Sequence, residues 1–101
     1  MTDSVYTVIV EKDLEDLVPA FMTNRRKEVE TLRAALEARD FEQLRQLGHR
    51  MKGVGNSYGF GKVSDLGKSI EDGARSEDRV VLEALIVDYA DYLERVQVVY
   101  E

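Results

Sequence analysis

The chain has 101 residues, of which 44% are hydrophobic and 34% charged, and its formal net charge is −6 at pH 7. This length is enough for one compact domain with a single core, and the acidic balance argues against nucleic acid as a partner, because phosphate contacts need a basic face. The absence of cysteine and the presence of one histidine exclude disulfides, thiolate zinc sites, cysteine nucleophiles and histidine-rich metal sites. We therefore predict no metal site.

No apolar run approaches the roughly 20 residues that a membrane span needs. The first residues, MTDSVYTVIVEKD, lack the basic start and the small-residue cleavage site of a signal peptide. We therefore expect a cytoplasmic protein that makes no contact with a membrane.

The chain begins with a segment that does not fit a helix. Residues 5–10 are rich in β-branched side chains, which favour an extended backbone. We assign residues 1–12 to an extended N-terminal segment and residues 13–101 to a helical bundle, which together form a single domain. The sequence leaves open whether the extended segment lies over one end of the bundle or pairs with another chain.

Two amphipathic helices follow this segment, each marked by apolar residues at spacings of three and four. The first is predicted over residues 14–39, and at Pro19, near its beginning, the helix either starts or tolerates a first-turn proline. The second begins at Asp40, whose spacing to Gln43 is that of a capping box. It ends at Gly59-Phe60-Gly61, where glycine accepts the left-handed backbone that often follows a helix.

Two further helices complete the chain. The third is predicted over residues 62–75, and Ser76 is predicted to cap the fourth. The fourth helix carries the most regular apolar stripe, formed by Leu82, Leu85, Ile86, Tyr89, Leu93, Val96 and Tyr100. Four such helices bury their stripes most simply as an all-α, antiparallel up-down four-helix bundle, here with a short extended N-terminal segment.

The only histidine, His49, lies on the second helix in the stretch LGHRMKGVG. At 100° per residue it points about 200° away from Leu47 and Met51 of the apolar stripe, and so toward solvent. Its predicted neighbours on this outer face are Arg45, Gln46, Lys52, Gly53 and Asn56.

Three glycines surround the histidine on this helix, although each interior glycine costs roughly 1 kcal/mol relative to alanine. Gly53 falls on the exposed face, where a glycine makes sense if a partner must come close to the imidazole. Gly48 and Gly55 fall nearer the flanks of the helix, and we expect them to admit neighbouring helices.

The residues around His49 restrict its chemistry. No carboxylate, serine or cysteine partner of a hydrolytic triad accompanies it, and the chain has no Walker loop or kinase glycine loop. Hydrolysis and direct transfer from ATP are therefore not expected. A neutral imidazole is a competent nucleophile toward phosphorus near pH 7, and the ammonium group of Lys52 could neutralise charge on the transferred phosphoryl oxygens.

The stretch HRMKG resembles the His-x-(Leu/Met)-Lys-Gly signature of histidine-containing phosphotransfer (HPt) domains. The likeness extends to Gly59 and covers most of the chain from Leu14 onward, including LRAALEARDFEQLRQLGHRMKG. Two residues depart from the pattern: Met51 replaces the commoner leucine, and Tyr58 stands where a smaller aliphatic residue is usual.

The resemblance implies a four-helix bundle whose histidine accepts a phosphoryl group from the phospho-aspartate of a receiver domain and passes it on. It implies that His49 is the phosphoacceptor, through Nε2, that Lys52 holds the phosphoryl oxygens, and that Gly53 leaves room for the receiver's loops. Mg²⁺ and most catalytic groups would come from the receiver. The chain would then have no intrinsic cofactor and would be a carrier rather than an enzyme.

The expected partner is a response-regulator receiver domain, a hybrid histidine kinase, or both, and the chain itself is expected to be a monomer. The candidate contact residues are Arg45, Gln46, Arg50, Gly53 and Asn56. The alternative function is a helical adaptor that binds a receiver or kinase through the same face without transferring phosphate. A helix-turn-helix that binds DNA is disfavoured by the acidic total charge.

Overall fold

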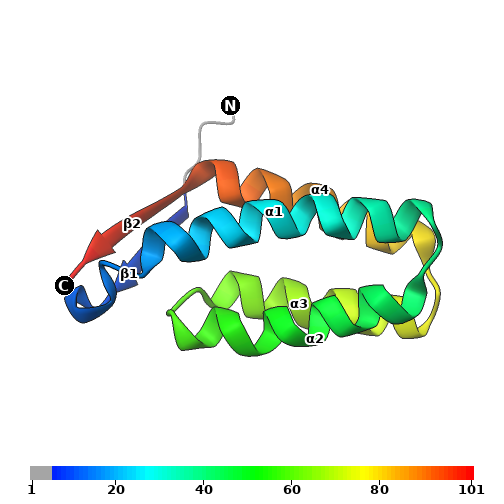
Figure 1. The fold of residues 1–101 in the computed structure, drawn as a ribbon, viewed down its shortest axis with the longest axis horizontal. Helices are drawn as coiled ribbons and strands as arrows, with labels where there is room; N and C mark the ends of the chain where they lie inside the picture. Colours follow the sequence, from blue (N-terminus) through cyan, green and yellow to red (C-terminus); the bar gives the residue numbers. More distant parts are fainter. Residues whose placement is uncertain (1–5) are drawn as a thin grey trace.

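The computed structural model describes residues 6–101, which form a four-helix bundle with a pair of short strands at one end (Figure 1). In chain order the elements are β1 (Tyr6–Val10), the 3-10 helix η1 (Lys12–Leu14), α1 (Val18–Glu37), α2 (Phe41–Ser57), α3 (Gly61–Arg75), α4 (Arg79–Arg95) and β2 (Val96–Tyr100). The pair α1 and α4 lies above the pair α2 and α3 in Figure 1. Over residues 6–101, no helix is both long and apolar enough to cross a membrane.

The apolar stripes of the four helices meet in one core. Their buried members include Leu44, Leu47, Met51, Val63, Leu66, Ile70, Leu82, Ile86, Tyr89 and Leu93, all of which the periodicity placed on inward faces. Full burial of a large aliphatic or aromatic side chain contributes roughly 1.5–3 kcal/mol. The prediction of four amphipathic helices is therefore confirmed for the described part of the chain.

The start of α2 and the turn after it follow the predicted signals. Oδ1 of Asp40 accepts a hydrogen bond from the backbone N–H of Gln43 at 3.1 Å, which makes Asp40 the N-cap. Gly59 has a φ of 83° in the turn that follows α2, a conformation that costs glycine little.

The structure decides one predicted helix start and corrects another. The first helix begins at Val18, beside Pro19, and not at residue 14, because Pro19 has no N–H to donate and belongs in a first turn. The fourth helix is capped by Asp78, whose side chain accepts from the backbone N–H of Val81 at 3.2 Å, and not by Ser76. Ser76 still has a helical backbone, with φ −85° and ψ −5°, and therefore ends α3.

The fold is not all-α, which corrects the predicted fold class. Strand β1 pairs with β2 in parallel, and Val8 lies opposite Val98. Val96 and Tyr100 therefore belong to a strand and not to the fourth helix. The extended segment thus pairs with the other end of its own chain. Residues 1–5 of that segment lie outside the described residues.

The strand pair packs on the bundle through alternate side chains. Val10 is part of the core, and Tyr6 packs on the ring of Tyr92 with centroids 5.0 Å apart. Val96 and Val98 of β2 also pack against the core. The β-branched residues of both segments suit a pleated, half-buried strand, and each segment supplies the backbone partner that the other needs. This mutual pairing explains why α4 ends at Arg95.

Candidate functional site

Glycines bring α2 and α3 into close contact at the centre of the site. A Cβ added at Gly48 would lie 2.6 Å from the carbonyl oxygen of Gly67, and one at Gly67 would lie 2.6 Å from that of Gly48. Further along α2, a Cβ at Gly55 would lie 2.6 Å from the backbone nitrogen of Ser64. The prediction that Gly48 and Gly55 admit a neighbouring helix is confirmed.

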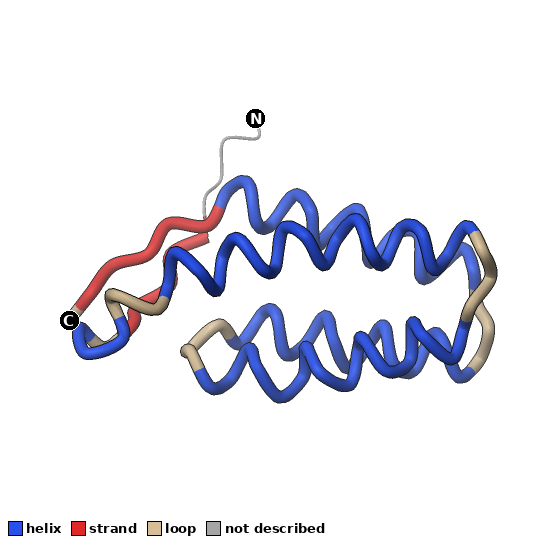
Figure 2. The backbone as a smooth tube through the Cα atoms, viewed as in Figure 1, coloured by secondary structure: helices blue, strands red, loops and turns tan. Residues whose placement is uncertain are grey.

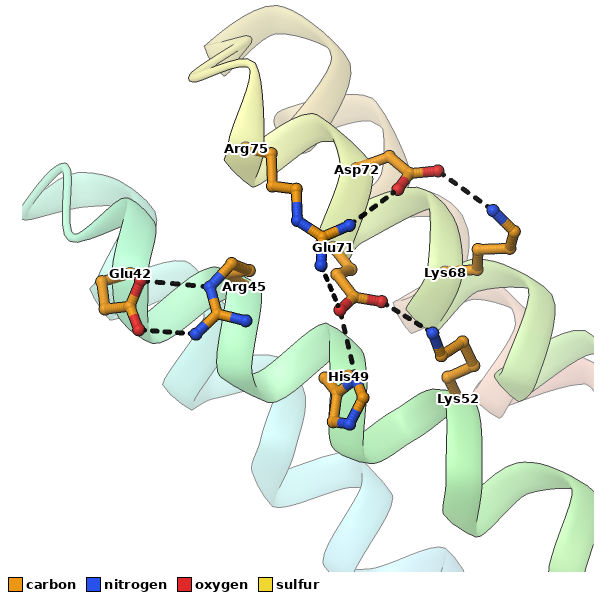
Figure 3. A network of polar contacts seen from close by, with 8 residues as sticks. All are labelled: Glu42, Arg45, His49, Lys52, Lys68, Glu71, Asp72 and Arg75. Atoms are coloured by element: carbon orange, nitrogen blue, oxygen red, sulfur yellow. Dashed lines mark hydrogen bonds and ion pairs between the residues drawn. The ribbon is translucent and has the colours of Figure 1, made fainter.

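This close contact places Glu71 of α3 beside His49 of α2. The backbone nitrogen of Glu71 would itself lie 2.6 Å from a Cβ at Gly48, the residue before His49. The Glu71 side chain extends from α3 toward α2, and Figure 3 shows its carboxylate between Lys52, Arg75 and the imidazole. The backbone contact thus determines which side chain lies against the histidine.

The imidazole of His49 is exposed on one side and anchored on the other. Its side chain is 64% exposed, which confirms the predicted outward orientation. Nδ1 lies 3.1 Å from Oε2 of Glu71 (Figure 3). An ionised carboxylate can only accept, so Nδ1 carries the proton and donates. In the neutral ring this leaves the lone pair on Nε2, at the far side of the ring from Glu71.

The side chain of Glu71 is 3% exposed, and its carboxylate binds three donors. Oε1 accepts from Nζ of Lys52 at 3.0 Å, and Oε2 accepts from Nη2 of Arg75 at 3.1 Å as well as from His49. The hydrogen bond from Lys52 is the main cause that lowers the pKa of Glu71, and His49 and Arg75 add to it against the opposing effect of burial. Glu71 is therefore ionised at neutral pH, with its buried charge fully paired.

Sequence reasoning missed this carboxylate, and the statement that no carboxylate accompanies His49 is wrong. Glu71 follows His49 by 22 positions and lies on a different helix. One signal was present in the sequence: Gly67 and Glu71 are four residues apart on the third helix, as Gly48 and Lys52 are on the second. Without the helix pairing, however, nothing connects the two patterns.

The cluster around Glu71 consists of Glu71, His49, Lys52 and Arg75. Of the other predicted residues, all of which lie on α2, only Lys52 belongs to it. Arg45 binds Glu42 through two hydrogen bonds, at 2.7 and 3.1 Å, and Gln46 donates to the same carboxylate at 3.0 Å. Arg50 and Asn56 are exposed. Gly53 is also exposed, and a Cβ added there would meet no atom within 4 Å.

Comparison with protein-family models gives a match to the Hpt domain over residues 16–98, which is more than half of the chain. The chain belongs to the Hpt domain family. Comparisons with curated proteins and with solved structures gave no match. Hpt domains are phosphotransfer carriers of two-component signalling that interact with receiver domains and kinases. The matched range of this Hpt domain contains His49, Lys52 and Glu71, whereas β1 lies outside it.

Proposed function

We propose that this Hpt domain carries phosphoryl groups in a phosphorelay and that His49 is the phosphoacceptor. In this proposal His49 accepts a phosphoryl group from the phospho-aspartate of a receiver domain and passes it to another partner. One observation supports it above all. Nδ1 is held by a buried carboxylate while the ring is 64% exposed, so Nε2 is the nitrogen offered to a partner.

The transfer step follows from this arrangement. The lone pair of Nε2 attacks the phosphorus, an N–P bond forms, and the P–O bond to the aspartyl carboxylate breaks, so that the aspartate leaves as a free carboxylate. The imidazole gains positive charge in this step while Nδ1 keeps its proton. Glu71 stabilises that charge through the 3.1 Å hydrogen bond and holds the ring in one orientation. The reverse reaction returns the phosphoryl group to a receiver.

Lys52 and Gly53 have distinct roles in the proposal. Lys52 is 41% exposed, lies on the same carboxylate as His49, and neutralises charge on the transferred phosphoryl oxygens. Gly53 has no neighbour within 4 Å of a Cβ position, so packing inside the chain does not require glycine there. We assign it to the approach of the receiver's active-site loops.

The remaining surface residues of α2 form the proposed receiver contact, namely Arg45, Gln46, Arg50 and Asn56. The receiver supplies Mg²⁺ and most catalytic groups, so the chain needs no cofactor of its own and is a carrier that depends on its partner. We place the carrier in the cytoplasm. We also propose that the four helices of its bundle run antiparallel, in up-down order.

The test is phosphoryl transfer from a panel of phosphorylated receiver domains to the wild type and to His49→Gln. Because His49 is largely exposed, this substitution leaves the core intact, and circular dichroism verifies that fold. The expected result is an acid-labile, base-stable phosphoryl group on the wild type alone. Arg33→Gln, which changes an exposed side chain of α1 outside the proposed receiver contact, serves as the control that still accepts phosphate. Binding of a receiver without transfer to the wild type would overturn the proposal in favour of the adaptor.

A further inference from the structure

The outer edge of β2 carries free backbone hydrogen-bonding groups. The bonds from Glu101 N–H to the carbonyl of Val10 and from Lys12 N–H to the carbonyl of Glu101 show that both backbone groups of Glu101 face β1. Backbone groups alternate in direction along a strand, so those of Val99 and Gln97 also face β1. The N–H and C=O groups of Val98 and Tyr100 therefore point to the opposite edge. Within residues 6–101 the sheet has two strands, so no third strand pairs with that edge.

The same sheet presents an apolar row on its outer face. Ile9 is 58% exposed and Val99 is 48% exposed, and the two lie opposite each other in the register of the strands. Neither YTVIV nor VQVVY contains a charged residue or proline, although charges and proline are what usually keep strand edges from pairing with other chains. The edge of β2 therefore combines unpaired hydrogen-bonding groups with an exposed apolar row.

We propose that the free edge of β2 pairs with the same edge of a second copy of this chain, which gives a dimer with a four-stranded sheet. Only an extended strand supplies alternating donors and acceptors at the spacing of this edge. The edge is complementary to itself when two copies run antiparallel about a two-fold axis at Val99. In that register Val98 of one copy exchanges both backbone hydrogen bonds with Tyr100 of the other.

Side chains on the outer face favour the same register. The two copies of Val99 become a directly opposed pair that lies between the hydrogen-bonded pairs, where side chains approach most closely. Ile9, Val99 and their counterparts then form one continuous apolar row of four residues across the sheet. Gln97 of one copy lies opposite Glu101 of the other, so that its amide can donate to the carboxylate. No like charges face each other across the axis, despite a net charge of −6 for each chain.

The sheet lies away from the centre of the bundle. Figure 2 shows the strands at one end of the molecule, next to η1 and beyond the ends of α2 and α3, with β2 at the margin of the view. None of the residues in the proposed pairing belongs to the cluster around Glu71. The dimer would therefore carry two histidines that both remain open to partners, and the inference is independent of the phosphotransfer proposal. It replaces the expectation of a monomer from the sequence.

Sedimentation equilibrium of the full chain over a series of rising concentrations tests the proposal. The expected wild-type mass rises from that of one chain toward that of two. Val99→Lys places two ammonium groups opposite each other on the axis and is expected to remain monomeric. The matched control is Thr7→Lys, which adds the same charge to the same exposed face, on β1 and away from the axis, and is expected to dimerise like the wild type.

A cross-linking experiment tests the register without depending on the stability of those variants. The chain has no cysteine, so Val99→Cys introduces a single thiol at the axis. Opposed Cβ atoms of such a pair lie about 4.5–5.5 Å apart, close to the distance that a disulfide bridges. Mild oxidation is expected to give a covalent dimer with Val99→Cys and little with Thr7→Cys.

Three results would each overturn the proposal. The first is a wild type that stays monomeric at every concentration. This result would also overturn the proposal if the edge of β2 were found to pair with a strand of another protein. The second is a dimer that Val99→Lys does not weaken, which would place the interface elsewhere. The third is equal cross-linking at positions 7 and 99, which would show random collision rather than one register.

Discussion

Replacing Gly48 with alanine puts a methyl group where the structure leaves no space between α2 and α3. The new Cβ would lie 2.6 Å from the nitrogen of Glu71, 2.6 Å from the oxygen of Gly67 and 3.1 Å from Cα of Glu71. All three are backbone atoms of a packed helix, so none can rotate away, and the helices must separate. Overpacking of this kind costs about 1–3 kcal/mol.

The intrinsic helix preference of alanine works in the opposite direction. Alanine gains about 1 kcal/mol over glycine inside a helix. Because the contacts at Gly48 are short and involve backbone, we take the upper end of the overpacking range, about 3 kcal/mol, and expect a net loss of about 2 kcal/mol in the free energy of unfolding. Separation of the helices also draws Glu71 away from His49, so phosphoryl transfer to Gly48→Ala is expected to be slower.

Gly53→Ala is the matched control on the same helix. A Cβ at Gly53 meets nothing within 4 Å, so only the helix preference remains and the free energy of unfolding should rise by about 0.5–1 kcal/mol. Urea unfolding followed by circular dichroism measures the free energy of unfolding of both variants. Their midpoints can be compared if the dependence of this free energy on urea concentration is the same as in the wild type. The reasoning is refuted if Gly48→Ala is as stable as the wild type, or if both variants shift in the same direction.

Three further predictions concern the polar groups. Tyr89 donates to Oε1 of Glu28 at 2.8 Å, whereas the hydroxyl of Tyr92 has no partner among the described residues, so Tyr89→Phe should cost about 1–3 kcal/mol in urea unfolding and Tyr92→Phe almost nothing. Equal losses would contradict this. Asp78→Ala should cost about 1 kcal/mol through loss of the cap on α4, while Ser76→Ala leaves the thermal midpoint nearly unchanged. The hydrogen bond from Lys52 lowers the pKa of Glu71 from its ordinary value of 4.5. The ionised carboxylate therefore stabilises the folded state at pH values above 4.5, and this contribution is lost as the pH falls through the lowered pKa. The stability advantage of the wild type over Glu71→Gln should therefore shrink in urea unfolding between about pH 7 and pH 3, and a constant difference would contradict the assignment.

Periodicity and local signals along the chain were enough to predict the helical pattern and the orientation of the histidine. Apolar spacings of three and four located all four helices, and the Asp40 cap and Gly59 turn followed from local backbone preferences. The outward direction of His49 followed from its phase against Leu47 and Met51, because a helix fixes the angle between nearby residues. These features depend on interactions within a few positions along the chain, which a single sequence contains in full.

Contacts between distant parts of the chain select the strand pair and the partner of the histidine. Val96 and Tyr100 continue the helical stripe through Leu93, and they fit the alternation of a strand equally well. The strand is selected because each residue of β2 pairs with a residue of β1 that lies ninety positions earlier in the chain. Glu71 lies at His49 because Gly48 and Gly67 let two helix backbones come close. Local periodicity shows which face of a helix is buried, but the depth of contact and the side chain found there depend on the neighbouring helix.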